Sequence, residues 1–149
     1  MTTAECRYGV SVVMLALLYF LPGDLEAMTS PLTSCPETPN CVSSASQDRR
    51  HRVEPLRYEG PVAEGQSRLK HIVLALPRTR LVEERADYLR FEFSSLIFGF
   101  VDDVEFYWED EPGTIQVRSA SRAGYWDLGT NRRRIEQIRK AFDEANRAS

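Results

Sequence analysis

The amino-acid sequence predicts an α+β domain, in which an antiparallel sheet of about five strands carries two helices on one face and follows an extended arm. Three observations lead to this fold class. Apolar and polar residues alternate in short segments between residues 78 and 121, as in half-buried strands. Apolar residues recur at helical spacing over residues 62–76 and 131–145. A turn signal, DEPG at residues 110–113, separates the last two strand-like segments. The predicted order is β-α-β-β-β-β-α.

The first strand and the first helix are marked by their boundary residues. Residues 56–58 form a short strand-like segment that Gly60 and Pro61 close. The helix after them ends at Pro77, which cannot continue it. One face of this helix carries its apolar residues, Val62, Leu69, Ile72, Val73 and Leu76.

Four strands and a second helix complete the domain. The strands are expected over residues 78–83, 87–95, 101–108 and 114–121. The second helix is expected over residues 131–145. Inward positions are assigned to Leu89, Phe91, Phe93, Val104, Phe106 and Trp108 on the strands, and to Ile135, Ile138, Phe142 and Ala145 on the helix.

The N-terminal region predicts export. Residues 10–21, VSVVMLALLYFL, form an apolar run of 12 residues, whereas a membrane-spanning helix needs about 20. The run has the length of the apolar part of a secretory signal, and Ala27 offers a small residue for cleavage. We therefore expect a signal peptide at residues 1–27, a Pro/Ser/Thr-rich extended arm at 28–53 and the α+β domain at 54–149. The expected compartment is the periplasm, or a lumen in a photosynthetic organism.

The cysteines support export. Cleavage removes Cys6 and leaves Cys35 and Cys41 in the segment CPETPNC, which predicts a disulfide across that loop. The alternative is lipid acylation of Cys35, because Leu32 to Cys35 resembles a lipoprotein box. His51, in the arm, and His71, at the solvent edge of the first helix, are the only histidines, so no metal site is predicted. No cofactor motif is present.

The charge balance bears on the partners. The chain has 19 basic and 22 acidic residues and a net charge of −3, which gives no reason to expect nucleic-acid binding. The expected partner is a protein or a small anionic ligand. Association with a membrane would be peripheral.

Charged residues cluster on the predicted hairpin. A four-residue turn at 110–113 makes facing residues sum to 223, so that Glu105 faces Arg118 on the outer face of the hairpin. Asp102 then points inward opposite Ser121, and a buried carboxylate needs partners. The nearest candidates are Ser119, Ser121 and Arg122.

The last helix begins with three arginines, residues 132–134, where its dipole favours negative charge. Three interpretations follow. The first is a structural network that locks helix to hairpin, with Asp102, Asp103, Glu105, Ser119, Ser121 and Asp127. The second is an anion site made of Arg118, Arg122, Gly129, Asn131 and Arg132. The third is an acid/base enzyme, a small hydrolase or isomerase, that uses Asp102 or Asp103 with Arg122.

Three segments carry a resemblance to a known family. They are SPLTSCPETPNCVSS, FGFVDDVEF and VRSASRAGYWDLGTNRRRIEQIR. Together they resemble the bacterial and plant-chloroplast family catalogued as domain of unknown function 1499, over residues 30–142. The resemblance implies one domain in an envelope or organelle setting and implies no catalytic residue. We expect a non-catalytic binding or assembly module of the cell envelope or photosynthetic membrane.

Overall fold

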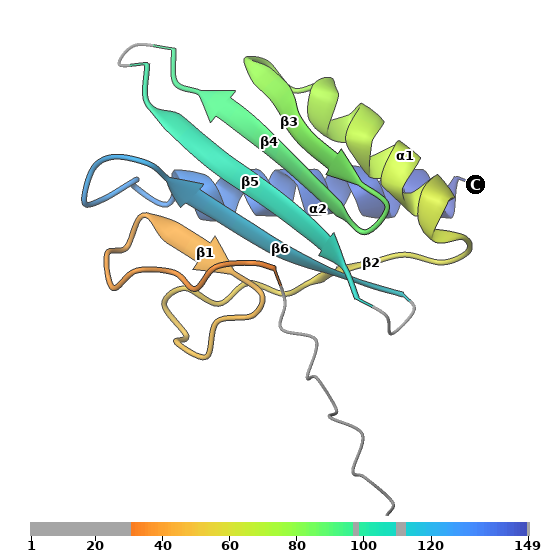
Figure 1. Ribbon diagram of the computed structural model, residues 1–149, viewed down its shortest axis with the longest axis horizontal. Coiled ribbons are helices and arrows are strands. Elements are labelled where there is room, and N and C mark those ends of the chain that lie inside the picture. Colours follow the sequence, from red (N-terminus) through yellow and green to blue (C-terminus); the bar gives the residue numbers. More distant parts are fainter. Residues whose placement is uncertain (1–30, 97–98, 110–112, 149) are drawn as a thin grey trace, which may run out of the picture.

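The computed structural model describes residues 31–96, 99–109 and 113–148, and it confirms the α+β architecture and the order of its elements (Figure 1). The expected signal peptide, the start of the arm and residues 110–112 of the predicted turn lie outside these ranges. Neither helix in the described ranges is long and apolar enough to cross a bilayer. The elements are β1 (Cys41–Ser43), β2 (Leu56–Arg57), α1 (Val62–Leu74), β3 (Thr79–Arg85), β4 (Tyr88–Ser94), β5 (Val101–Trp108), β6 (Thr114–Ser121) and α2 (Thr130–Arg147).

All strand pairs of the sheet are antiparallel, and the strands lie in the order β1-β6-β5-β4-β3, while β2 pairs with the start of β6. Strands β2 to β6 are the five that the sequence predicts. The sixth, β1, forms within the segment expected to be an extended arm, because residues 41–43 pair with residues 118–120 of β6. The arm therefore extends the sheet beyond β6.

The predicted hairpin register is confirmed. Trp108 pairs with Ile115, Glu105 pairs with Arg118, and Asp102 pairs with Ser121. Because neighbouring residues of a strand point to opposite faces, this register sends Asp102 toward the helices and Asp103 away from them.

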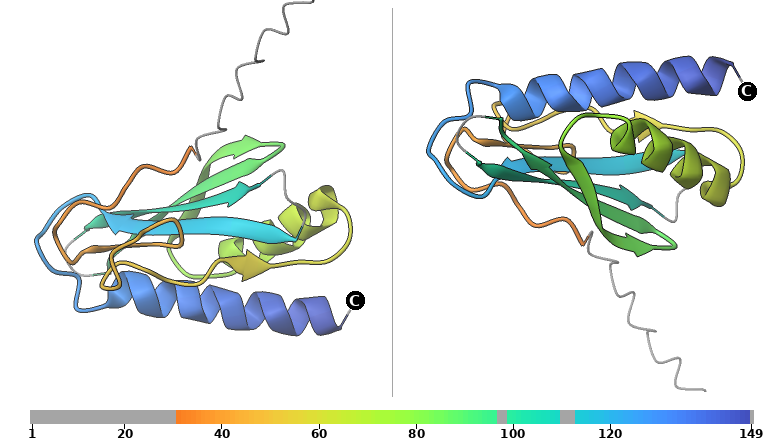
Figure 2. Two further views of the ribbon diagram at one scale, coloured as in Figure 1. Left: turned by 90° about the horizontal axis from the view of Figure 1, so that it is seen from below. Right: turned by 90° about the horizontal axis from the view of Figure 1, so that it is seen from above.

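Both helices cover the same face of the sheet (Figure 2). Their apolar stripes meet the inward residues of the strands in one core, in which the rings of Phe91 and Phe106 pack edge to face at 6.0 Å. Val42 and Val53 of the arm join this core. Its largest fully buried side chains include Leu56, Leu69, Val73, Leu89, Phe91, Val104, Phe106, Ile115, Val117, Ile135, Ile138 and Phe142.

Residues 31–36 of the arm run along the opposite face of the sheet (Figure 2). Leu32 packs there against Tyr88 and Tyr107, and all three side chains are buried. Glu105 and Arg118 pair on this outer face, as the register predicts. Their ion pair of 2.6 Å joins side chains that are only 9% and 13% exposed, so the pair is buried and not on an open surface.

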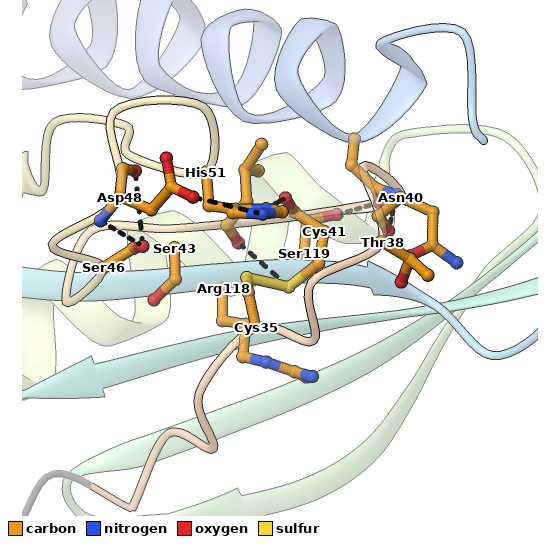
Figure 3. The surroundings of a disulfide bond; sticks show 12 residues. Cys35, Thr38, Asn40, Cys41, Ser43, Ser46, Asp48, His51, Arg118 and Ser119 are labelled. Carbon is orange, nitrogen blue, oxygen red and sulfur yellow. Dashed lines mark hydrogen bonds and ion pairs between the residues drawn. A yellow bond between two sulfur atoms is a disulfide. The ribbon is translucent and has the colours of Figure 1, made fainter. Parts of the chain in front are cut away.

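The predicted disulfide joins Cys35 to Cys41, with 5.6 Å between their Cα atoms, and so ties the arm to β1 (Figure 3). His51, expected in a flexible arm, is 5% exposed, and its Nδ1 lies 2.8 Å from the carbonyl oxygen of Cys41. This hydrogen bond and the short β1 strand hold the segment in place.

Candidate functional site

The inward carboxylate of Asp102 is paired with Arg134, a residue of the second turn of α2. An Nη2–H of Arg134 donates to Oδ2 of Asp102 at 2.5 Å, and both side chains are about seven-eighths buried. The guanidinium also lies 4.7 Å from the ring centroid of Phe93, within reach of a cation–π contact. Asp102 points inward as the sequence predicts, but its charged partner is Arg134 and not Arg122.

A fully buried asparagine completes this pair. Oδ1 of Asn131 accepts hydrogen bonds from Arg134 at 2.7 Å and from the hydroxyl of Ser119 at 2.5 Å. Its amide donates to the carbonyl oxygen of Asn40 at 3.0 Å and to the hydroxyl of Ser121 at 3.1 Å. The serines that the sequence assigned to Asp102 therefore serve Asn131. The resulting network fastens α2 to β5, β6 and the start of β1, as buried polar groups require.

Arg122 lies on the other face of the sheet. It donates to both oxygens of Asp103, at 2.7 and 2.8 Å, and to Glu92 at 2.5 Å. Hydrogen bonds from Arg122 and Arg80 hold the pKa of Glu92 below its usual range, and the bonds to Asp103 and Glu92 raise the pKa of Arg122. Asp102 and Asp103 thus face opposite sides of the sheet, each with its own arginine.

The negative group expected at the start of α2 is Asp127. Its carboxylate accepts hydrogen bonds from the backbone N–H groups of Gly129 at 2.9 Å and Asn131 at 2.8 Å. Leu128 and Gly129, with φ of 55° and 75°, turn the chain so that Asp127 reaches these groups.

The arginines at this terminus diverge. Arg132 donates to the carbonyl oxygens of Arg50 and Arg52, both at 2.8 Å, and Arg133 donates to the carbonyl of Leu128 at 2.7 Å. The backbone N–H groups of Gly129 and Asn131 already bond Asp127. Arg122 bonds Asp103 and Glu92 on the other face of the sheet, and Arg118 is buried on that face. The structure therefore does not bring the residues of the expected anion site together.

A cavity of about 450 Å³ lies beside this terminus, between the end of α1, the end of β4 and the first two turns of α2. No sequence pattern predicts this cavity, because residues from three separate elements line it. Four of its lining residues are apolar: Leu76, Pro77, Phe93 and Leu96. The rest of the lining is polar or charged: Arg78, Ser94, Ser95, Asp102, Thr130, Arg133, Arg134 and Gln137.

The charge of this cavity is unbalanced. Three arginines line it against one acid, Asp102, which is already paired with Arg134. Arg78 and Arg133 form no ion pair with any carboxylate in the described ranges. Arg78 also has a left-handed backbone, with φ of 57°, which costs a residue with a side chain about 1–2 kcal/mol. Its Nε donates to the carbonyl of Ser94 at 3.0 Å, so its position is defined.

Two other hollows are lined by both basic and acidic side chains. One, of about 760 Å³, lies beside Tyr58 and has three arginines and two glutamates in its lining. The other, of about 580 Å³, lies beside the disulfide and has one arginine and two acids in its lining. The described residues contain no group of three or more His, Cys, Asp or Glu side chains placed to hold a metal ion.

The chain was compared with known proteins. A sequence model of a family described as "Protein of unknown function (DUF1499)" matches residues 31–142, about three quarters of the chain. No curated protein matches it. The matched segment contains the disulfide, the Asp102–Arg134 pair and every residue that lines the cavity beside α2.

Proposed function

The chain belongs to the DUF1499 family, and from this premise we propose that it is an exported, non-catalytic binding module of the cell envelope or photosynthetic membrane. Its ligand is a small amphipathic anion, a carboxylate or phosphate that carries an apolar chain. The site is the cavity beside α2. Export is supported by the short apolar run at residues 10–21 and by the disulfide, which oxidising compartments preserve.

The observation that carries this proposal is the composition of the cavity wall. Leu76, Phe93 and Leu96 offer apolar surface, while Arg78 and Arg133 bring positive charge that no carboxylate of the described ranges neutralises. A guanidinium is suited to bidentate binding of a carboxylate or phosphate. The volume of about 450 Å³ lies within the range of small-molecule sites, roughly 300–1,000 Å³.

The Asp102–Arg134 pair has a supporting role in this proposal. Arg134 is fixed by three hydrogen-bonding partners and by Phe93, so the floor of the cavity is rigid. A rigid floor reduces the ordering cost of binding. The charge without a carboxylate partner in the described ranges includes that of Arg133, whose side chain is exposed and bonds oxygens of its own helix terminus.

The enzymatic alternative has less support. It would use Asp102 or Asp103 as a general base, with Arg122 to stabilise developing negative charge. Asp102 faces the helices, on the side of the sheet opposite to Arg122. Asp103 already accepts two hydrogen bonds from Arg122, so neither carboxylate is a free base beside a free guanidinium.

Isothermal titration calorimetry with decanoate tests the proposal. We expect saturable binding of decanoate and of decyl phosphate, and much weaker binding of decanol, which lacks the charge, and of acetate, which lacks the chain. Arg133→Ala should weaken decanoate binding roughly tenfold, about what one charge-assisted hydrogen bond contributes.

Lys140→Ala is the matched control, because Lys140 is an exposed cation of the same helix outside the cavity lining. It should leave decanoate binding unchanged. Equal affinity for decanol and decanoate would refute the role of the arginines. Absence of decanoate and decyl phosphate binding would refute the proposed ligand class.

A further inference from the structure

The largest exposed apolar side chains gather at one end of the molecule. In the described ranges seven large apolar side chains are exposed, and five of them belong to two loops, β4–β5 and β6–α2. These loops lie at the same end of the sheet in all three views (Figures 1 and 2). The five are Leu96, Phe100, Tyr125, Trp126 and Leu128, which are 75%, 49%, 72%, 67% and 63% exposed.

The β6–α2 loop is held in shape although its apolar side chains are exposed. The amide of Asn40 donates to the carbonyl oxygen of Gly124 at 2.5 Å at its start, and Asp127 bonds the first N–H groups of α2 at its end. Tyr125 and Trp126 lie between these two anchors. The loop therefore presents its aromatic side chains from a fixed base, and their exposure does not result from a lack of local structure.

Among the described residues at this end, arginines without a carboxylate partner outnumber the acid of the β6–α2 loop, Asp127, whose carboxylate bonds backbone N–H groups. Arg78 and Arg133 pair with no carboxylate of the described ranges, and Arg132 bonds only backbone carbonyls, so its charge is not neutralised by a partner. Arg133 and Leu96 line the same cavity, which places the cations next to the exposed apolar surface.

We propose that this end of the molecule docks on an anionic membrane surface, with Tyr125, Trp126 and Leu128 inserted at the level of the lipid headgroups. Trp and Tyr side chains, apolar in the body and polar at the tip, suit this depth. Adjacent arginines add attraction to anionic lipids. A projecting loop with three such residues has the geometry for shallow insertion.

This docking goes beyond the proposed function and does not depend on it. The cavity shares Leu96 with the docking surface, so a docked molecule would hold the cavity beside the headgroups. Trp126 does not line the cavity. The two proposals can therefore fail separately.

The tryptophans provide a direct reporter. The chain has two, and Trp108 is 3% exposed in the core whereas Trp126 is 67% exposed. In a Trp108→Phe variant, emission reports on Trp126 alone. Vesicles of phosphatidylglycerol and phosphatidylcholine should shift this emission to shorter wavelength, and lipids brominated near the headgroup should quench it. Pure phosphatidylcholine vesicles should give a much smaller effect, and added salt should reverse the binding.

Sedimentation with the same vesicles tests the loop in the otherwise unchanged chain. Trp126→Ala should lower the partition coefficient roughly tenfold, as expected for the loss of one large inserted side chain. Val62→Ala, an exposed apolar residue at the start of α1, should leave it unchanged. Every variant carries the same N-terminal segment, so differences between variants report on the loop.

Three outcomes would overturn the docking proposal. The first is a Trp126 emission that anionic vesicles leave unchanged. The second is equal partitioning of the Trp126→Ala and Val62→Ala variants. The third is a Trp126 emission that depends on protein concentration and not on lipid, which would assign the surface to a contact between copies of the chain. Decanoate binding by Trp126→Ala, expected at the unmodified level, reports on the cavity independently.

Discussion

Removal of the Asp102 carboxylate should destabilise the protein far more than removal of the carboxylate of Asp103. In Asp102→Ala, the guanidinium of Arg134 stays behind with its side chain only 12% exposed and without a counter-charge. It keeps its hydrogen bonds to Ser119 and Asn131 and its contact with Phe93, but these partners are neutral. An uncompensated buried charge costs about 3–5 kcal/mol of unfolding free energy.

The neighbouring carboxylate provides the matched control. Arg122, the main partner of Asp103, is 44% exposed and keeps its bond to Glu92 when Asp103 is removed. Water can solvate the guanidinium of Arg122 that remains, so Asp103→Ala should lower the unfolding free energy by less than about 1 kcal/mol. Urea melts of the two variants measure the difference between adjacent residues of one strand.

A double substitution separates the lost pair from other effects. Replacement of Arg134 by Met removes the stranded charge, so Asp102→Ala combined with Arg134→Met should be more stable than Asp102→Ala alone. Equal losses for Asp102→Ala and Asp103→Ala would refute the assigned strand faces. A double variant less stable than Asp102→Ala would refute the assignment of Arg134 as the buried partner.

Three further predictions concern the disulfide, Tyr88 of β4 and the N-terminus. Cys35→Ser should lower the unfolding free energy in urea melts by about 2 kcal/mol, because the disulfide closes a short loop. Full reduction of the parent should cause the same loss, and a variant that is less stable than the reduced parent would locate the effect elsewhere. Burial and the hydrogen bond to Glu105 raise the pKa of Tyr88, so its contribution to stability is complete below about pH 10 and falls as the pH rises above that value. Absorbance titration at alkaline pH should therefore lose its latest phase in Tyr88→Phe, and an unchanged profile would contradict this. N-terminal sequencing and thiol titration of the native protein should give a start near Met28 and no free thiol, whereas an intact residue 1 would exclude cleavage.

The hairpin shows how far the sequence determines this fold. Two alternating segments flank one turn signal, so the turn length alone sets which residues face each other. The pairing of Glu105 with Arg118 and of Asp102 with Ser121 follows from that arithmetic. The helices and strands β3 and β4 follow from periodicity in the same way, although α2 extends one residue earlier and two residues later than expected. Strand β1 does not, because its segment was expected to be part of the extended arm.

The burial of the outer face could not be predicted from the hairpin. Glu105 and Arg118 lie on a face that alternation marks as exposed, yet their side chains are only 9% and 13% exposed. On the same face Leu32, which is distant in sequence, packs against Tyr88 and Tyr107. The covering segment has no periodicity, because it lies on the sheet without extending it. A long-range contact of this kind leaves no local pattern.

The role of Arg134 did have a signal. Asn131 and Arg134 continue the buried stripe of Ile135 and Ile138 toward the helix start, at spacings of three and four residues. A polar side chain on an apolar stripe indicates a buried partner. Residues 132–134 form one basic group in the sequence, but each of the three side chains bonds a different neighbour.

Native mass spectrometry of the protein purified from its own host tests the central claim, that the cavity beside α2 holds an amphipathic anion. We expect one small molecule to be retained per chain, and to be identified after release as a carboxylate or phosphate with an apolar chain. Arg133→Ala, expressed in the same host, should lose it, whereas Lys140→Ala should keep it. A retained neutral or cationic molecule would contradict the account, as would a bare protein that also takes up no decanoate.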